Sequence, residues 1–470
     1  MTTALSQEAA HRTSGSCGSV PAPSHAVPRG WFVGAPKGAR AGRGPIAMGE
    51  VELCAAMTDL TVPSFASRAD FVGVHLLVSM HRQPIGIVLV PSDWFNPDGR
   101  IRAPELLAAT VKSELWTEVV DHLREDGLAI PSELGPAGLS VVANPPCSWA
   151  SRLGSARPSV TVCIATCGGD PAPLLRTIRS ALAQTYDNFQ VLVVDNRPGS
   201  SGLPGPLVDE FFDDDRLFYV TEPQPGLGTV RNRGIREAEG EIVALTDDDV
   251  ALSSDWLGSL VAAFDVPEVA CVTGLILPDE LVTGPELLIE EFGGFSKGFR
   301  RRRWDLDGNR LDHPLYPYIL GMYGSGANAA WRRSAIEAIG GYDDYLGTGT
   351  KARGGEDLDI YLECVLRGHQ LVYEPAALIR HEHHRDLRAL RRQIFDYGAG
   401  LGAVLTKRLL HEQERRDLLP RLGAGLEYLL NPRSPKNRGK STTYPRSLTA
   451  AELAGIAYGP VAYLRSRARR

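Results

Sequence analysis

The spacing of hydrophobic residues changes from one stretch of the chain to the next, and each spacing indicates a different element. Between residues 72 and 80 apolar side chains recur at every second position, and the alternation resumes from 85 to 90 after a break that ends at Pro84. This pattern predicts a β-hairpin. From Pro104 the apolar spacing becomes helical, with one apolar face that continues until Gly127. Residues 67–135 are therefore expected to form a small α+β module.

A second region, residues 157–385, alternates short apolar runs with segments of helical spacing. The runs typical of strands lie at 160–164, 191–194, 217–220, 242–245 and 269–277. The helical segments between them lie at 174–184, 229–237 and 256–264. This alternation predicts an α/β fold with a mostly parallel sheet between helices. From residue 386 to 470 the chain is expected to be helical and basic.

Composition adds limits to this picture. Residues 1–65 are rich in Gly, Ala, Ser and Pro without sustained periodicity and are predicted to be a disordered leader, so that Met48 is a candidate for the true start. The formal charge of −6 over 470 residues argues against general nucleic-acid binding. Seven cysteines show no paired spacing, and the closest pair, Cys163 and Cys167, lacks the further ligands of a zinc motif. With no membrane-spanning run and no signal-peptide pattern, a cytoplasmic location is expected.

Three consecutive carboxylates, Asp247, Asp248 and Asp249, follow the apolar run 242–245. In an open α/β sheet the carboxyl ends of the strands form the ligand-binding edge. Three adjacent anions repel one another unless solvent, a cation or basic side chains relieve them, and Mg²⁺ or Mn²⁺ on a diphosphate would do so. The alternative interpretation is a solvated acidic turn that opens the next helix.

Two other expected strand ends carry groups that suit a nucleotide. Thr166 precedes a polar turn with two glycines, whose backbone N–H groups can approach a ligand. Asp195 can accept hydrogen bonds from a base or a ribose. A glycine turn further on leads into a segment with Arg231 and Arg233, and a helix N-terminus with guanidinium groups suits phosphate. A plain loop followed by a surface helix is the alternative for this last segment.

A second acidic cluster, Glu356 and Asp357, follows two glycines at the start of a predicted helix. Helix capping explains either carboxylate, but the same placement suits a base directed into a cleft. His381 and His383 then follow a strand-like segment, and either is a candidate third metal ligand.

Taken in order, these motifs resemble the family 2 glycosyltransferases with the GT-A fold, over residues 159 to about 384. The motifs are Val-Cys-Ile-Ala-Thr166, Leu-Val-Val-Asp195, Val-Arg-Asn-Arg-Gly234, Thr-Asp-Asp-Asp249, Gly-Gly-Glu-Asp357 and the late His381. Each motif alone is weak, but six in the right order and spacing are a strong signal. The extra N-terminal module and the helical C-terminal region lie outside the resemblance.

The resemblance implies roles for single residues. Asp247 and Asp249 match the ends of the DxD motif that holds Mg²⁺ or Mn²⁺ against the donor diphosphate, and His381 looks like the late metal ligand, with His383 as its rival. Asp357 matches the base that activates the acceptor, with Glu356 beside it as a second catalytic candidate. The residues implied in donor binding are Thr166, Asp195, Arg231, Asn232, Asp247 and Asp248. The segment 326–332 looks like the acceptor side.

The implied reaction is a single displacement that moves a hexose from a nucleotide diphosphate to a hydroxyl acceptor with inversion. One carboxylate base suffices, because a metal neutralises the leaving group, whereas a glycosidase needs two carboxylates. Synthesis of a glycan, glycolipid or cell-envelope polysaccharide is expected. The alternatives are a sugar-phosphate nucleotidyltransferase and a catalytically inactive, partner-binding paralogue; a dehydrogenase is disfavoured because no GxGxxG follows the first strand.

Basic segments bear on the acceptor. Arg300 to Arg303, the basic C-terminal tail and the partly apolar stretch 394–405 suit an anionic membrane surface at the inner face of the plasma membrane, and hence a lipid-linked or polymeric acceptor. A solvated protein surface is the alternative interpretation of these charges.

Overall fold

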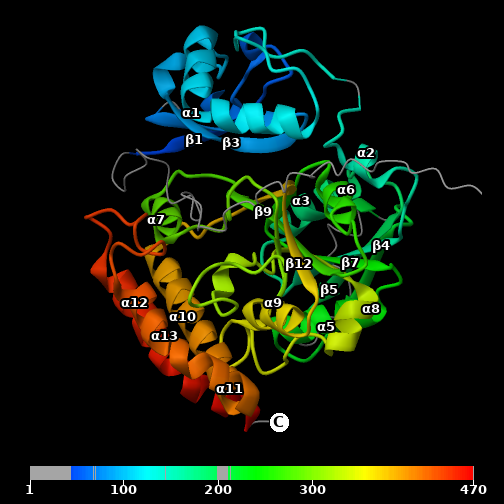
Figure 1. Cartoon of the computed structure of the whole chain (residues 1–470), viewed down its shortest axis with the longest axis vertical. Helices are drawn as coiled ribbons and strands as arrows, with labels where there is room; N and C mark the ends of the chain where they lie inside the picture. Colours follow the sequence, from blue (N-terminus) through cyan, green and yellow to red (C-terminus); the bar gives the residue numbers. More distant parts are fainter. Residues whose placement is uncertain are drawn as a thin grey trace, which may run out of the picture.

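The N-terminal part of the protein is a three-stranded sheet covered by one long helix. The computed structural model describes residues 44–66, 68, 70–142, 144–197, 210–211 and 213–468 (Figure 1). Strands β2 (Gly73–Met80) and β3 (Gln83–Pro91) form the predicted hairpin, and α1 (Pro104–Glu125) is the predicted helix. Alternate residues of β2, including Val74, Leu76 and Val78, pack with α1 in one apolar cluster, because successive side chains of a strand point to opposite faces.

One expectation about the leader is wrong. Strand β1 (Ile46–Glu52) lies inside the span 1–65 that was expected to be disordered, and it pairs in parallel with β2, with Ile46 opposite Gly73. A seven-residue strand carries little periodic signal, and its hydrogen-bond partners come from β2, which composition does not reveal. The N-terminal module therefore includes residues 44–66 that the structure describes. Residues 1–43 of the expected leader lie outside the described residues.

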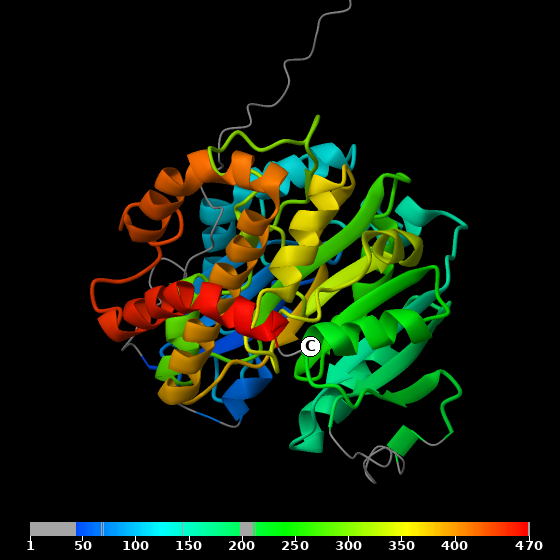
Figure 2. The same ribbon diagram turned by 90° about the horizontal axis from the view of Figure 1, so that it is seen from below.

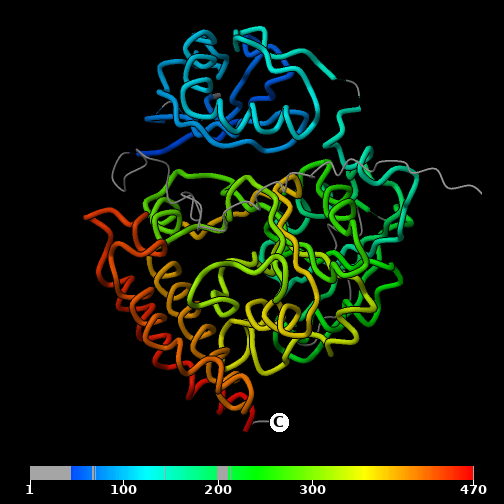
Figure 3. Tube along the Cα trace, in the orientation of Figure 1, coloured from blue at the N-terminus to red at the C-terminus, as the bar shows by residue number. Residues whose placement is uncertain are grey.

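The second face of this small sheet packs on the larger part of the protein. Leu77 of β2 belongs to the same buried cluster as Leu371 and Tyr373 of the larger sheet. The Ile46 N–H donates to the Leu281 carbonyl at 2.8 Å. Figure 3 shows the module above the large domain, connected through the segment that leads to α2 (Trp149–Leu153).

The large domain is built on a nine-stranded mixed sheet. Its order is β10-β12-β9-β11-β7-β4-β5-β6, and β8 pairs with β12. The strand bounds are β4 (Val160–Thr166), β5 (Phe189–Asp195), β6 (Leu217–Thr221), β7 (Ile242–Asp247), β8 (Val250–Leu252), β9 (Val269–Pro278), β10 (Arg302–Trp304), β11 (Asn328–Arg332) and β12 (Gln370–His381).

The expectation of a mostly parallel sheet holds for only part of it. Strands β4, β5, β6 and β7 run parallel, but β11 is antiparallel to both of its neighbours, β7 and β9. The direction of a strand depends on which end of its neighbouring strands the chain comes from. The pattern of residues within the strand does not encode this. The expected α/β class, a sheet flanked by helices, is confirmed.

Helices cover both faces of the large sheet. Helices α3 (Pro171–Leu182) and α6 (Trp256–Ala262) share one buried cluster, whereas α5 (Leu227–Glu237), α8 (Arg333–Ile339) and α9 (Glu356–Leu366) share the other. Helix α7 (Gly284–Phe292) lies in the long segment between β9 and β10. These two clusters are the core that holds the strand ends in place.

The C-terminal region is helical, as its sequence predicts. It consists of α10 (Leu387–Leu410), α11 (Glu412–Leu418), α12 (Leu422–Leu430) and α13 (Arg446–Arg467). Helices α10 and α13 lie side by side (Figure 2). A Cβ at Gly402 would lie 2.3 Å from the Ile456 carbonyl oxygen, so the helices approach closely because glycine occupies that point. Among the described helices, none is long and apolar enough to cross a membrane.

Candidate metal centre and donor site

The three aspartates lie where the chain turns from β7 into β8. Strand β7 ends at Asp247, and the chain turns through Asp248 and Asp249 into β8, which pairs with the end of β12 so that Val250 lies opposite His381. This pairing brings the His381 Nε2 atom to 3.4 Å from Asp249 Oδ1. Asp247, Asp249 and His381 each offer a ligand atom, and these atoms lie within 4.8 Å of one another.

The polar atoms of this group fit a divalent cation. Asp249 Oδ1 and His381 Nδ1 are buried and have no hydrogen-bond partner among the described residues. Burial raises the pKa of Asp249; the His381 ring opposes the shift and the Asp247 charge adds to it. Two carboxylates and an imidazole, with unpartnered buried atoms on Asp249 and His381, are a suitable ligand set for Mn²⁺ or Mg²⁺.

The structure distinguishes the two histidine candidates. The His383 ring is buried and its Nε2 lies 2.9 Å from Glu290 Oε1 on α7, so it forms a pair outside the aspartate group. His381 instead points to Asp249. The difference arises because β12 ends at His381, so His381 stays paired beside β8 whereas His383 lies beyond the strand. We therefore retain His381 as the candidate ligand.

Arg231 connects the two acidic clusters. Its Nη2 atom lies 3.1 Å from Asp247 Oδ1 and its Nη1 atom lies 2.9 Å from Glu356 Oε1. The side chain is buried, and its guanidinium packs 5.6 Å from the centre of the Tyr342 ring. A buried guanidinium needs paired anions, so this contact holds the end of β7 and the start of α9 in one site.

Glu356 and Asp357 have different environments at the start of α9. Burial, followed by the neighbouring Asp357 charge, raises the pKa of Glu356 to about 7, against the opposing effect of Arg231. Asp357 is only half-buried; its Oδ2 accepts a hydrogen bond from the Gly326 N–H at 3.0 Å. Gly355, at φ 90°, makes the turn that aims both carboxylates. The geometry therefore favours Asp357 as the accessible base and Glu356 as the residue that holds Arg231.

The donor-side candidates divide into two groups. Burial raises the pKa of Asp248 to about 6; a hydrogen bond from Thr166 opposes this shift and the Asp249 charge adds to it. Thr166 and Asp248 therefore share one edge of the site. Asn232 is bound to the protein itself: its Nδ2 donates to the Tyr342 carbonyl at 2.8 Å, and its Oδ1 accepts from the Tyr342 N–H.

Asp195 is fully buried at the end of β5. The Arg197 Nε lies 2.9 Å from each of its carboxylate oxygens, and the Tyr219 hydroxyl donates to Oδ2. This carboxylate therefore positions Arg197, a third of whose side chain is exposed. Whether Asp195 itself contacts a donor stays a prediction.

Sequence reasoning missed three side chains near the site. The half-buried ammonium of Lys297 has its pKa lowered to about 8 by burial, while the Asp357 charge opposes the shift. The Phe295 ring centre is 5.4 Å from that of His381 and 6.4 Å from that of Tyr397 on α10. Lys297 and Phe295 lie in the segment between α7 and β10, and only the folded chain brings this segment close to the acidic residues and His381.

Comparison with known proteins gives a family for the region that contains the site. Residues 161–340 match the family described as Glycosyl transferase family 2. The chain is 27% identical over 214 residues to the glucosyl-dolichyl phosphate glucuronosyltransferase of Haloferax volcanii, which covers 44% of this chain and 63% of that protein. It is 31% identical over 250 residues to the pre-mycofactocin glycosyltransferase of Mycobacterium tuberculosis, covering 53% and 48%.

The matched regions are partial. The chain spans less than two thirds of the length of either relative. A solved structure of a mannosyltransferase from Pyrobaculum calidifontis, in complex with GDP-Man and Mn²⁺, overlaps with a TM-score of 0.42 at 21% identity, over 67% of this chain and 81% of that one. The family match spans β4 to the end of α8 and therefore contains the three aspartates and Arg231, but not Asp357 or His381.

Proposed function

We propose that this chain, whose residues 161–340 form a domain of glycosyltransferase family 2, moves a sugar from a nucleotide diphosphate donor to a hydroxyl acceptor with inversion. The observation that supports this most is the Arg231 bridge between Asp247 and Glu356, because it brings a cation-binding group and a candidate base into one site. The site then offers each kind of group that the proposed reaction needs: a metal-binding group, a base and donor-side polar groups.

Each group has a proposed task. Asp247, Asp249 and His381 would hold Mn²⁺ or Mg²⁺. The bound ion would supply charge neutralisation for the departing diphosphate. Thr166, Asp195, Arg231, Asn232 and Asp248 are proposed on the donor side, Arg231 and Asn232 by positioning β7 and the loop at Tyr342.

Asp357 is the proposed general base. Its Oδ2 keeps a lone pair beyond the bond from Gly326, and its Oδ1 beyond the bond from the Leu358 N–H. As the acceptor oxygen forms its bond to the anomeric carbon, Asp357 takes the hydroxyl proton, and the bond from that carbon to the diphosphate oxygen breaks. Attack from the face opposite the leaving group inverts the configuration. Glu356 holds Arg231 and so fixes the start of α9.

A panel of nucleotide sugars tests the proposal. The full chain, supplied with Mn²⁺ or Mg²⁺, is expected to hydrolyse at least one nucleotide sugar slowly without an acceptor, and to stop when a chelator removes the ion. Asp249→Asn is expected to lose this activity, whereas Asp307→Asn, a change on the exposed surface, keeps it. Hydrolysis of none would support an inactive paralogue, and formation of a nucleotide sugar from a sugar phosphate would support a nucleotidyltransferase.

We also propose that the acceptor is lipid-linked or polymeric and is met at the cytoplasmic face of a membrane. Arg300, Arg301 and Arg303 are weaker candidates for this contact, because they pair with Asp121 and Asp265. An exposed apolar stripe on and before α12 is the better candidate; its residues are Leu419, Leu422, Leu426 and Leu430. The spacing places the last three on one helical face, a pattern that suits the lipid interface.

Co-sedimentation with vesicles containing anionic lipid tests this contact. The full chain is expected to bind at low salt, and Leu422→Glu with Leu426→Glu is expected to abolish binding. Leu387→Glu, at an equally exposed leucine at the start of α10, is the matched control and should bind normally. Equal sedimentation of all three proteins, or of none, would contradict the proposal.

A further inference from the structure

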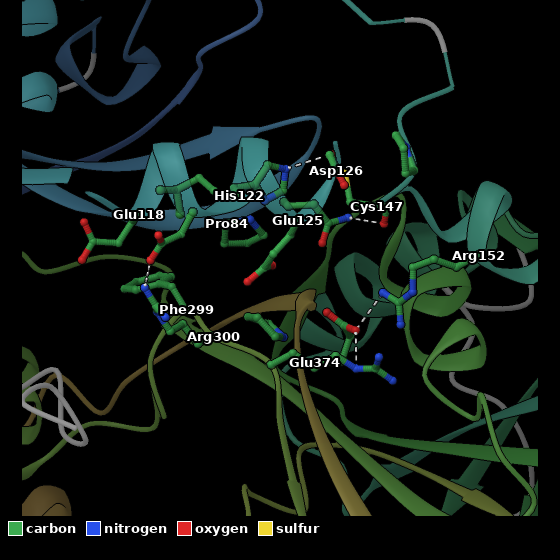
Figure 4. A pocket seen from close by; sticks show the side chains of 16 residues that line it. Pro84, Glu118, His122, Glu125, Asp126, Cys147, Arg152, Phe299, Arg300 and Glu374 are labelled. Atoms are coloured by element: carbon green, nitrogen blue, oxygen red, sulfur yellow. Dashed lines mark hydrogen bonds and ion pairs between the residues drawn. The ribbon is translucent and has the colours of Figure 1, made fainter. Parts of the chain in front are cut away.

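Four side chains of metal-ligating types meet far from the aspartate group. They lie where the N-terminal module joins the linker, which is the segment between α1 and α2. His81 lies in the β2–β3 turn, His122 is in the last turn of α1, Asp126 is its C-cap residue, and Cys147 lies in the segment before α2. One ligand atom from each residue lies within 4.8 Å of the others. Figure 4 shows His122, Asp126 and Cys147 gathered along one side of a pocket.

The contacts within this cluster converge on one ring nitrogen. The His81 Nδ1 atom lies 3.0 Å from Asp126 Oδ2, 3.3 Å from His122 Nε2 and 3.6 Å from Cys147 Sγ. A ring nitrogen carries either one proton or one lone pair, so it can satisfy only one of these three partners. Hydrogen bonding to Asp126 explains one contact and leaves the other two unexplained.

The separations match the edges of a metal tetrahedron. With zinc bonds of about 2.0–2.1 Å to nitrogen or oxygen and about 2.3 Å to sulfur, tetrahedral ligands lie about 3.3 Å apart, or about 3.6 Å when one is sulfur. The His122–Asp126 separation is 3.4 Å, and His81 lies 3.3 Å from His122 and 3.6 Å from Cys147, as these values require. The His81–Asp126 distance of 3.0 Å is slightly shorter than a tetrahedral edge. Two neutral imidazoles, a carboxylate and a thiolate also balance the charge of a divalent ion.

The backbone holds the cluster in place before any ion arrives. His81 has φ 54°, a backbone conformation that residues other than glycine rarely adopt. The carboxylate of Glu52, at the end of β1, accepts from the His81 N–H at 3.0 Å and from the Arg82 N–H at 2.9 Å, and so stabilises this turn. His122 and Asp126 are four residues apart and therefore point to the same side of the helix end.

We propose that His81, His122, Asp126 and Cys147 bind one Zn²⁺ ion that fastens the linker to the N-terminal module. Four protein ligands leave no open coordination position, which is typical of a structural rather than a catalytic zinc site. The adjoining cavity of about 430 Å³ provides a path for the ion, and its other wall carries Arg300 and Glu374 of the large domain. The ion therefore stabilises the position from which the linker enters α2.

Metal content and cobalt substitution of the full chain test the proposal. Protein purified without chelator is expected to retain one equivalent of zinc through desalting. After zinc is exchanged for Co²⁺, a thiolate-to-cobalt charge-transfer band and the intense visible bands of four-coordinate cobalt should appear. Removal of the ion by a chelator should lower the melting temperature, and one equivalent of zinc should restore it.

Variants separate this site from other cysteines and from the aspartate group. Cys147→Ser should lose the charge-transfer band, and His122→Gln should lose the retained zinc. Cys54→Ser, at a half-buried cysteine of the same module, and Asp249→Asn should keep both. Wild-type protein that retains no zinc and gives no thiolate band would overturn the proposal, whether or not the variants fold. A thiolate-to-cobalt band that survives in Cys147→Ser would also overturn the proposal. Zinc retained by the wild-type protein, together with a band lost in Cys147→Ser but kept in Cys54→Ser, would support it.

Discussion

Asp247 and Glu356, far apart in the sequence, bind to opposite ends of one guanidinium group, that of Arg231. Asp247 belongs to the candidate cation site and Glu356 lies beside the candidate base, so both parts of the site depend on one buried cation. Removing that cation leaves two carboxylates in a poorly solvated place with no compensating charge.

Arg231→Met is therefore expected to destabilise the protein by about 3–5 kcal/mol, which is the usual effect of breaking a buried ion pair. Arg233→Met, two residues further along the same helix, breaks only a partly exposed pair with Glu237 and should cost less than about 1 kcal/mol. Chemical denaturation of both variants measures the difference. Similar losses from the two would show that Arg231 is not the connection that the geometry indicates.

Asp357→Asn removes the proposed base but keeps the shape of the side chain. We expect transfer to fall by roughly 10²–10⁴-fold, the typical contribution of a general base, while donor binding is unchanged. Transfer rates and the donor dissociation constant, measured separately, check this. Asp386→Asn, which alters the aspartate that caps α10, is the matched control and should transfer at the wild-type rate. Near-normal transfer by Asp357→Asn would exclude it as the base.

His75 is expected to make the protein less stable in mild acid. Burial lowers its pKa to about 4; Glu290 opposes this shift and Arg380 adds to it. Neither ring nitrogen has a hydrogen-bond partner among the described residues. An unfolded histidine titrates near 6.5, so the unfolded state binds more protons between pH 6.5 and 4, and stability falls as the pH is lowered through that range, by up to about 3 kcal/mol.

The free energy of unfolding, measured at several pH values, tests this effect. His75→Leu should reduce the loss of stability between pH 6.5 and 4, since the leucine has no proton to gain. His411→Gln, at an exposed histidine, should leave the pH dependence of the wild-type protein unchanged. Parallel pH curves for wild type and His75→Leu would show that His75 is not buried in its neutral form.

The close packing of α10 on α13 is expected to exclude any side chain at Gly402. Alanine normally stabilises a helix interior by about 1 kcal/mol relative to glycine. At Gly402, however, the added Cβ would lie 2.3 Å from the Ile456 carbonyl oxygen, and the resulting strain should cost about 1–3 kcal/mol. Gly423→Ala in α12, where no atom lies within 4 Å of the added Cβ, should be neutral or stabilising. Melting temperatures that rise for both variants would contradict the packing described here.

Local patterns in the sequence were enough to identify most elements and several members of the site. The hairpin of β2 and β3 and helix α1 follow from periodicity, because each period reflects the geometry of one element. The strands that end at Thr166, Asp195 and Asp247 follow from short continuous apolar runs. The order of the acidic motifs was enough to indicate the family that residues 161–340 match. β1 was missed because its pairing partner is not local.

The amino-acid sequence by itself determined which residue types stand at the ends of strands and at the start of α9, since these depend on neighbours along the chain. Only the tertiary structure decided which of them meet: that β11 enters antiparallel, that His381 rather than His383 reaches Asp249, and that Arg231 joins Asp247 to Glu356. The cluster of His81, His122, Asp126 and Cys147 has no sequence signature at all, because a turn, a helix end and a linker contribute its ligands. Contacts between residues distant in sequence are set by how the elements pack, and packing follows from the whole chain.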